Sequence, residues 1–398
     1  MHDRNRWYAA CGVLLLAMVA VLLSPLPSPT VSAASQTPEV LAKAQPGDLL
    51  RWEPMPDMGG HPVWRILYVS TDLNGNPIPV SGLIAVPGAP MPDSGFPLLA
   101  IGHPTSGVAR GCAPSLILLE GESEMATLYE QALSPYLDAG YALVMTDFQG
   151  LGAAGSSSYV IGELEGKNIL DSIRAARLFP VTTLSDQLVL MGHSQGGHAV
   201  AFATQLAPGY APGLAIDGVV MLAPAVNLTG IFEDIMGPDE RTANTALILF
   251  VVSSWSETYP QASLDQVTTS RGQFIVDTVI KETCLIVSSL AASLLTPSRL
   301  IQPDAPTTWA GLLQQNTPGT GPWEPPVLVI HGEADEIIDQ RFTGEYVEGL
   351  CASGATVEYH TIGGATHFGV LADSEAGNLQ WIAARFASEV APSTCHGS

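Results

Sequence analysis

A serine flanked by glycines is the first place in this 398-residue chain where side-chain types and spacing could do chemistry. Gly192–Gly196 reads GHSQG and fits the pattern G-x-S-x-G. It lies between the apolar run Leu188–Met191 and a helix-like run that begins near Gly197. A sharp strand-to-helix turn exposes a serine hydroxyl at a helix N-terminus, and its glycines let neighbouring backbone segments approach. The pattern therefore predicts that Ser194 is a nucleophile.

A histidine base and an orienting carboxylate should follow the serine, because a serine hydroxyl is too weakly acidic to attack an ester unaided. On folds with this turn the order along the chain is serine, acid, histidine. Asp335 stands in the loop after the apolar run Val327–His331, and His367 stands in the glycine-rich loop Gly363–Phe368 after the next run. We expect Asp335 and His367 to complete a catalytic triad. Three further carboxylates remain open as the acid: Glu333, Glu336 and Asp339.

The other histidines favour structural roles. His193 and His198 flank the serine, but an adjacent side chain cannot easily turn its ring to the hydroxyl. His331 ends one predicted strand, where a hydrogen bond would hold it, and His360 lies inside the next. His61 has no motif around it and is expected at the surface. The predicted base is therefore the histidine of the glycine-rich loop.

An oxyanion hole is the remaining requirement, since two preorganised N–H groups would stabilise the negative charge that develops in the transition state. One is the backbone N–H of Gln195, directly after the nucleophile. The second should come from a loop after an early strand, and Phe96–Gly102 is followed by His103–Gly107, which reads HPTSG. Pro104 has no N–H, so Thr105 is the predicted donor.

The segments that must position these residues alternate between strands and helices. Short apolar runs predict strands, and stretches of helical length and pattern stand between most of them. Continuous apolar strands covered by helices on both faces imply an α/β fold with a mainly parallel central sheet. An Asn-Gly pair at 74–75 predicts an N-terminal hairpin. The predicted strands are Val63–Thr71, Ile78–Val86, Phe96–Gly102, Tyr141–Asp147, Gln187–Gly192, Ile216–Leu222, Val327–His331 and Thr356–Ile362; the predicted helices are Glu122–Ala139, Leu164–Leu178, Gly197–Ala207, Arg341–Ala352 and Ala376–Glu389.

The alternation fails once, between the sixth and seventh predicted strands. Thr245–Ser256, Phe274–Leu295 and Thr307–Gln315 look helical there, and Pro318–Pro322 reads as a linker. We interpret residues 228–322 as a helical cap inserted into one core domain. The core is then formed by residues 35–227, which include the hairpin, and by residues 323–398.

The N-terminal segment predicts export. Arg4 and Arg6 precede the apolar run Ala9–Leu23, prolines break the run, and small residues follow up to Ala34, as in a signal peptide over residues 1–34. The run is shorter than the ~20 residues that span a bilayer, so no stable membrane insertion is expected after cleavage. In an oxidising compartment an even number of cysteines suggests disulfides, with a pairing that the sequence leaves open. The mature chain would keep Cys112, Cys284, Cys351 and Cys395.

The charge balance excludes one class of function. Lys and Arg number 15 and Asp and Glu 38, a formal net charge of −23 that repels phosphate backbones and anionic membranes. Nucleic-acid binding is therefore excluded, whereas a hydrophobic content of 46% supports a large folded core. Surface carboxylates are expected to keep such an exported protein soluble. Its histidines, cysteines and carboxylates lack the spacing of metal ligands, so we expect no metal site.

Four motifs stand together along the chain: HPTSG at 103–107 with Cys112–Pro114, TDFQGLG at 146–152 with Tyr159–Gly162, GHSQGGH at 192–198, and HGEAD at 331–335. Together they resemble the secretory lipase family, the lipase A type of α/β-hydrolase. The resemblance covers nearly the whole mature chain. It implies an α/β-hydrolase fold, a helical cap over the acyl site, and no cofactor. It also implies catalytic roles for Ser194, Asp335 and His367.

The same resemblance implies two disulfides. Cys112–Cys284 would tie the oxyanion side to the cap, and Cys351–Cys395 would hold the C-terminal helix. The chain departs from the family pattern at the predicted oxyanion hole. Pro104 replaces a common glycine, and some members use an acidic residue as the donor where Thr105 stands.

The residues and the resemblance predict a secreted serine hydrolase, extracellular or in the cell envelope, that cleaves carboxylic esters. The expected substrates are neutral esters, triacylglycerol or other acyl-glycerol lipids, met at a lipid–water interface. The runs Leu247–Val252 and Leu285–Leu290 could line a tunnel for a long acyl chain or form the cap's own core. The alternative is a secreted acyltransferase, or a short-chain or polyester esterase, with the same triad.

Overall fold

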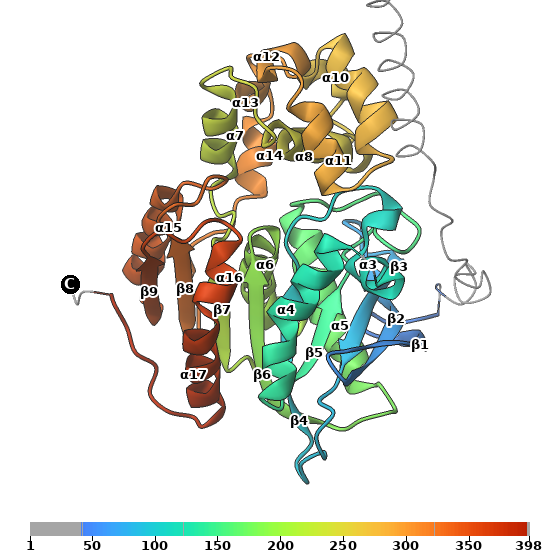
Figure 1. Cartoon of the computed structure of the whole chain (residues 1–398), viewed down its shortest axis with the longest axis vertical. Coiled ribbons are helices and arrows are strands. Elements are labelled where there is room, and N and C mark those ends of the chain that lie inside the picture. Colours follow the sequence, from blue (N-terminus) through green and yellow to red (C-terminus); the bar gives the residue numbers. More distant parts are fainter. Residues whose placement is uncertain (1–40, 42, 122, 322, 396–398) are drawn as a thin grey trace, which may run out of the picture. The chain divides into compact units, whose positions relative to one another are not determined.

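A sheet of nine strands forms the centre of the part of the chain that the structure describes (Figure 1). This computed structural model describes residues 41–395 except 42, 122 and 322. The predicted signal peptide, residues 1–34, lies outside the described residues. The strand order is β1-β2-β3-β5-β4-β6-β7-β8-β9. The strands are β1 Leu49–Met58, β2 His61–Thr71, β3 Pro77–Ala85, β4 Phe96–Gly102, β5 Ala142–Thr146, β6 Leu184–His193, β7 Gly218–Leu222, β8 Val327–Gly332 and β9 Val357–Ile362.

Two kinds of pairing divide the sheet. The strands β1, β2 and β3 pair antiparallel, and β3 pairs antiparallel with β5. The neighbours from β5 through β4, β6, β7 and β8 to β9 pair in parallel. The predicted mainly parallel sheet and the β2–β3 hairpin are therefore confirmed. Parallel strands end at the same edge, so the loops after β4, β6, β8 and β9 come together, as is usual for sites on such sheets.

Among the nine described strands, β1 is the one that the sequence pattern does not predict. It reads LLRWEPMPDM, and its prolines and charged residues are unusual in strands. Proline is tolerated at sheet edges, where its missing N–H costs no ladder hydrogen bond. β1 stands at one end of the described strand order and pairs with β2. Its register with β2 shifts near Met55, which fits an irregular edge strand.

Helices cover both faces of the sheet (Figure 1). Leu98 and Ala100 of β4 face one core with α5, α6 and α15, whereas Leu99 and Ile101 face a second core with α4, α16 and α17. This alternation follows from the two-residue period of a strand. The predicted layered α/β architecture is confirmed. The elements of these layers are η2 Arg110–Cys112, α3 Pro114–Glu120, α4 Glu124–Asp138, α5 Gly162–Arg177, α6 Gln195–Tyr210, α15 Gln340–Ala352, α16 Gly369–Asp373 and α17 Glu375–Phe386.

Helices fill the segment between β7 and β8, where the sequence predicts a cap. We call residues 228–316 the helical insertion. The insertion buries a core of its own, with Ile248, Phe250 and Trp255 fully buried. Its elements are α7 Leu228–Met236, α8 Thr245–Thr258, α9 Leu264–Val267, α10 Ser270–Ile275, the π-helical turn η3 Val276–Ile280, α11 Leu285–Ala292, α12 Pro297–Leu300, α13 Ala305–Thr308 and α14 Ala310–Gln315.

One long helix predicted over Phe274–Leu295 is wrong. The structure divides it into the end of α10, the turn η3 and the separate helix α11. The break lies at Cys284, which is extended (φ −88°, ψ 175°), pairs as an isolated bridge with Gly107, and forms a disulfide with Cys112. A contact with a distant loop therefore overrides the local helical pattern.

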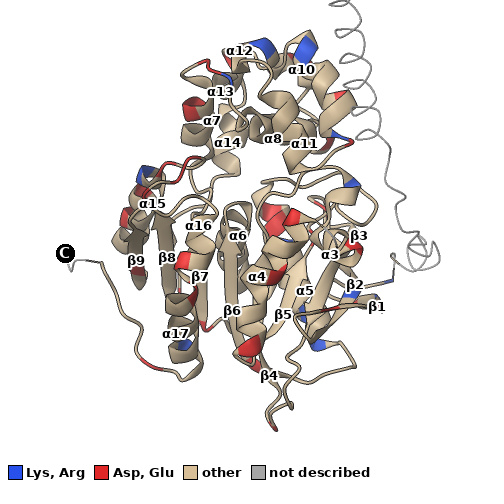
Figure 2. Cartoon of the chain, viewed as in Figure 1, with Lys and Arg blue, Asp and Glu red and all other residues tan. Residues whose placement is uncertain are grey.

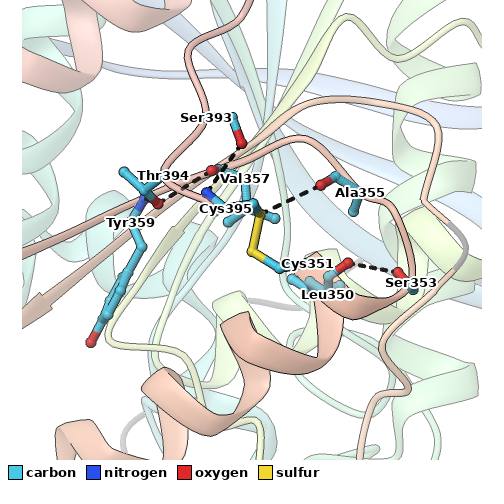
Figure 3. The surroundings of a disulfide bond; sticks show 9 residues. All are labelled: Leu350, Cys351, Ser353, Ala355, Val357, Tyr359, Ser393, Thr394 and Cys395. Atoms are coloured by element: carbon cyan, nitrogen blue, oxygen red, sulfur yellow. Dashed lines mark hydrogen bonds between the residues drawn. A yellow bond between two sulfur atoms is a disulfide. The ribbon is translucent and has the colours of Figure 1, made fainter. Parts of the chain in front are cut away.

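Two disulfides link distant segments, with the pairing that the family resemblance implies. Cys112, at the end of η2, joins Cys284 in the helical insertion. Cys351, in the last turn of α15, joins Cys395 near the C-terminus (Figure 3). Thr394 N also donates to Val357 O at 2.8 Å, which lays the C-terminal segment along β9. Both bonds fit an oxidising compartment.

Charged groups are unevenly balanced on the surface. Asp and Glu stand on the helices α4, α7 and α15 (Figure 2), and over the whole sequence they outnumber Lys and Arg by 38 to 15. This excess supports solubility for an apolar-rich chain. Within the described ranges, we find no helix with the length and hydropathy needed to cross a membrane.

Replacing Cys351 and Cys395 together by serine tests the C-terminal bond, with Cys112–Cys284 left intact. The bond joins residues 44 positions apart, and its loss gives the unfolded chain more freedom. We expect the free energy of unfolding to fall by about 2 to 4 kcal/mol. Urea denaturation followed by circular dichroism measures the change. An unchanged midpoint would show that the bond does not stabilise the fold.

Candidate active site

The strand, turn and helix predicted around Ser194 are present. β6 ends at His193 and α6 begins at Gln195, and Ser194 between them has a positive φ (φ 56°, ψ −117°), which is strained for a residue with a Cβ. The glycines make this possible. A Cβ on Gly196 would lie 1.8 Å from Gly102 O, and one on Gly192 would lie 2.1 Å from Gly196 O. The turn therefore requires glycine at both places.

The structure brings His367 and Asp335 together. His367 Nδ1 lies 2.7 Å from Asp335 Oδ2, and the backbone N–H groups of Ile337 and Ile338 each donate to Asp335 Oδ1 at 2.8 Å. Burial raises the pKa of Asp335, but hydrogen bonds from His331 and His367 outweigh it and hold that pKa well below the usual value. Asp335 is thus ionised and accepts the Nδ1 hydrogen, which leaves Nε2 of His367 as a proton acceptor.

The other carboxylates that the sequence left open take different partners. Glu333 accepts from Thr361 Oγ1 at 2.8 Å, and Asp339 caps α15 by accepting from Arg341 N at 2.9 Å. Glu336 accepts from the backbone N–H of His367 at 3.1 Å and not from its ring. Among the described residues, the geometry favours Asp335 as the acid.

His331 is a second donor to the acid. Its Nε2 lies 3.0 Å from both Asp335 Oδ2 and Ile338 O, and its Nδ1 lies 2.8 Å from Thr343 Oγ1. A carbonyl oxygen only accepts, so Nε2 carries a hydrogen and Nδ1 accepts from the threonine hydroxyl. The sequence predicts a hydrogen-bonded histidine at this strand end, and the structure adds that one of its acceptors is Asp335.

His193 contacts the predicted base rather than the serine hydroxyl. Its Nε2 lies 2.8 Å from His367 O, and the two rings lie 4.7 Å apart between centroids. Burial lowers the pKa of His193 to about 3, with the charge of His367 as a second cause. The ring is therefore neutral near pH 7 and donates through Nε2 to the His367 carbonyl.

Thr105 and Gln195, the predicted oxyanion donors, line the same cavity as Ser194. Thr105 Oγ1 lies 3.0 Å from Tyr159 OH, and this contact fixes the Thr105 side chain. Gln195 is the first residue of α6, and the first N–H groups of a helix have no intrahelical acceptor. The backbone N–H of Gln195 is therefore suited to bind an oxyanion.

A mainly apolar cavity of about 360 Å³ opens onto these residues. The two apolar runs of the insertion contribute to it only in part. Leu247, Ile248 and Val251 line the cavity, whereas Leu249 and Phe250 of the same run do not. Ile248, Leu249 and Phe250 are all fully buried in the insertion's core. The helical insertion thus supplies apolar walls to a site whose polar groups come from the sheet. The remaining lining residues include Ser194, His367, Phe368, Leu228, Ile231, Phe232, Ile235, Leu285, Ile286, Ile337 and Ile338.

Glu165 is a buried carboxylate next to the serine turn, and no sequence motif predicts it as a site residue. Glu165 Oε1, in the first turn of α5, accepts from Gln195 Nε2 at 2.6 Å and from Val160 N at 3.0 Å. Glu165 Oε2 lies 3.4 Å from His198 Nδ1. Burial raises the pKa of Glu165 despite these contacts. A glutamate early in a helix is ordinarily explained by the helix dipole, and only the fold brings it beside Gln195.

Among the described residues, no group of three or more His, Cys, Asp or Glu side chains could hold a metal ion. The polar groups of the site instead form hydrogen-bonded pairs, such as His367 with Asp335 and Gln195 with Glu165.

The parallel sheet, the helices on both faces and the serine turn after β6 define an α/β-hydrolase with a helical insertion between β7 and β8. The chain belongs to the secretory lipase family, whose pattern matches residues 122–394.

Solved structures support this fold. Candida antarctica lipase A in its closed state is similar with a TM-score of 0.79 at 23% identity, covering 94% of this chain and 90% of that one. The rice cell wall degrading esterase LipA of Xanthomonas oryzae is similar with a TM-score of 0.70 at 19% identity, covering 86% of this chain and 98% of that one. At these identities the likeness concerns the fold.

The proteins that are similar to this chain in sequence include both a named lipase and a protein named as probably inactive. A secreted triacylglycerol lipase of Malassezia globosa is 26% identical, covering 84% of this chain and 74% of that protein. A Mycobacterium tuberculosis protein named a probable inactive lipase is also 26% identical, covering 83% of this chain and 75% of that protein. The names of its relatives therefore leave the activity of this chain to the residues of its own site.

The variant His193→Gln tests the buried neutral ring, because glutamine can still donate to His367 O. In the unfolded chain a histidine has a pKa near 6.5, against about 3 here. Above about pH 6.5 both states are neutral at this position, and below it the unfolded chain binds the proton first. The wild type should therefore lose up to about 1.4 kcal/mol more stability than the variant for each pH unit between about 6.5 and 3. Urea denaturation at several pH values checks this; equal losses would contradict a depressed pKa.

Proposed function

We propose that this chain is a secreted serine hydrolase that cleaves carboxylic esters through an acyl-enzyme on Ser194. The observation that carries the proposal is one cavity lined by both Ser194 and His367, the latter bonded to Asp335 at 2.7 Å. Residues of the types needed for a nucleophile, a base and a buried acid are all present, which supports activity, because a site that has lost activity normally lacks one of them. Membership of a secretory family and two disulfides support an extracellular or cell-envelope location.

Acylation is the first half of the proposed reaction. Asp335 holds His367 with its hydrogen on Nδ1, so that Nε2 takes the proton of Ser194 Oγ as the oxygen attacks the ester carbonyl. The backbone N–H groups of Thr105 and Gln195 receive the negative charge on the carbonyl oxygen. His367 then gives the proton to the alkoxy oxygen, and the alcohol leaves.

Deacylation uses the same groups in reverse. His367 takes a proton from water, the resulting hydroxide attacks the acyl carbonyl, and the proton returns to Ser194 Oγ as the carboxylic acid leaves. The imidazolium formed in both halves is stabilised by ionised Asp335, whose charge is held by its two backbone N–H donors and His331.

The proposed substrates are neutral esters with an apolar acyl group, triacylglycerol or other acyl-glycerol lipids. The cavity's walls are aliphatic and aromatic side chains of the helical insertion, which suit a hydrocarbon chain. The relative from Malassezia globosa is named a triacylglycerol lipase. Hydrolysis rates along a series of p-nitrophenyl esters, from acetyl to palmitoyl, separate a lipase from a short-chain esterase. Transfer to an added alcohol in preference to water would favour an acyltransferase.

The variant Ser194→Ala tests the nucleophile. We expect kcat on p-nitrophenyl butyrate to fall by at least about a thousandfold, because no other group can form the acyl-enzyme, while the fold stays intact. Ser172→Ala is the matched control, since Ser172 is also buried but bonds to Ile169 O within α5. Near-normal activity in Ser194→Ala would refute the proposal.

An exposed apolar stripe beside the cavity supports docking at a lipid–water interface. Ile286, Leu290 and Leu294, four residues apart along and just beyond α11, are 55%, 63% and 62% exposed, and Ile286 also lines the cavity. This spacing places them on one side of a helix. A lipid surface would cover a stripe that water leaves unfavourably exposed.

The double variant Leu290→Ser and Leu294→Ser tests this stripe. Activity on emulsified triacylglycerol should fall by about tenfold, because less apolar surface inserts into the lipid. Activity on soluble p-nitrophenyl acetate should not change. Val390→Ser is the control for an exposed apolar residue far along the chain, with 95% exposure. A parallel loss on both substrates, or no loss on the emulsion, would count against interfacial docking.

A further inference from the structure

Three segments meet at one buried asparagine behind the serine turn. Asn316 follows the last helix of the insertion, and its Oδ1 accepts from the backbone N–H of Gly162, where α5 begins, at 3.1 Å. It also accepts from Tyr259 OH, at the end of α8, at 3.1 Å. The main-chain oxygen of Asn316 lies 2.7 Å from His198 Nε2 in the first turn of α6. The end of the insertion is thereby tied to the first turns of α5 and α6.

Glu165 and His198 face each other within this junction, and neither of the two facing atoms has another hydrogen-bond partner among the described residues. Asn316 O only accepts, so His198 Nε2 carries a hydrogen, and His198 Nδ1 faces Glu165 Oε2 at 3.4 Å. Both side chains are fully buried. Two facing lone pairs in such a place would be strongly unfavourable, so one proton lies between them.

The side chain of Gln195 connects this pair to the reaction. Gln195 directly follows the nucleophile, and its Nε2 donates to Glu165 Oε1 at 2.6 Å. The peptide that carries its N–H belongs to a strained turn, since Ser194 has a φ of 56°. The first turn of a helix supplies no acceptor that would orient this N–H. The hydrogen bond from the Gln195 side chain to Glu165 therefore restrains Gln195 in a way that the helix alone does not.

On the basis of the proposed function, we propose that Glu165 and His198 are a positioning pair for the oxyanion hole. Glu165 holds the Gln195 side chain so that the Gln195 N–H points to the developing oxyanion, and His198 ties Glu165 to the end of the helical insertion through Asn316. The position of the insertion and the orientation of the oxyanion donor are thereby coupled. Neither residue touches the substrate or exchanges a proton with it.

The variants Glu165→Ala and Glu165→Gln test the pair on p-nitrophenyl butyrate. We expect Glu165→Ala to lower kcat by about 10- to 100-fold with KM changed less than about twofold, because the N–H acts mainly in the transition state. Glu165→Gln should stay within about threefold of the wild type, because its carboxamide can accept from Gln195 and donate to neutral His198.

Asp171→Ala is the matched control. Asp171 is also fully buried on α5 and also bonds several side chains, among them Ser70 and Tyr210, but it lies two turns further along the helix. It should lower the unfolding temperature and leave kcat of the folded enzyme unchanged. If Glu165→Ala lowers kcat no more than this control does, or raises KM instead, the positioning role is refuted.

Gln195→Met tests the same link and leaves the buried Glu165 carboxyl group where it is. Methionine keeps the backbone N–H and the side-chain length but cannot bond to Glu165. It should lower kcat about as much as Glu165→Ala, and the double variant should be no worse than either, because both changes break one interaction. Additive losses in the double variant would refute the inference, and a wild-type kcat in Gln195→Met would refute it even if Glu165→Ala failed to fold. An inactive wild type would refute the proposed function itself, and this inference with it.

Discussion

The hydrogen bond between His367 and Asp335 is the interaction on which the proposed chemistry depends. At 2.7 Å it joins the loops after β8 and β9 and sets the ring hydrogen on Nδ1. Asp335 can stay ionised although it is buried, because two backbone N–H groups and His331 also donate to it. The strands β6, β7, β8 and β9 pair in parallel, so they all end at the same edge of the sheet. The serine turn and these two loops therefore start at that edge. The topology of the sheet thus brings His367 and Asp335 close enough to form this hydrogen bond.

The helical insertion complements this polar edge with apolar surface. It packs its own core, lines the cavity over Ser194, and is tied to the sheet domain by Cys112–Cys284 and by Asn316. Charge and hydrophobicity are therefore separated. Carboxylates give the chain its net charge of −23, which favours solubility, whereas mainly apolar side chains line the cavity beside Ser194, as the proposed neutral, apolar ester requires.

Local features explain what the sequence could predict. The serine turn, the parallel strands and the order of Ser194, Asp335 and His367 are visible because each depends on a short run or a known order. The features that the sequence does not predict depend on contacts between distant segments. They are the helix break at Cys284 and the partners of Glu165. His61 shows the same limit, since it was expected at the surface but is buried, accepting from Gly88 N and facing Asp138 at 3.2 Å. A polar residue's partners cannot be assigned until the fold places them.

Reaction with a fluorophosphonate probe tests the central claim most directly, because it measures activation of the nucleophile without assuming a substrate. Peptide mass spectrometry should find one phosphonylated residue, Ser194, in the wild-type protein. Labelling should be lost in His367→Ala and strongly slowed in Asp335→Ala, since the serine then lacks its base or the base lacks its orienting acid. No labelling of the folded wild type, or labelling of Ser194 at an undiminished rate without His367, would contradict the proposed triad.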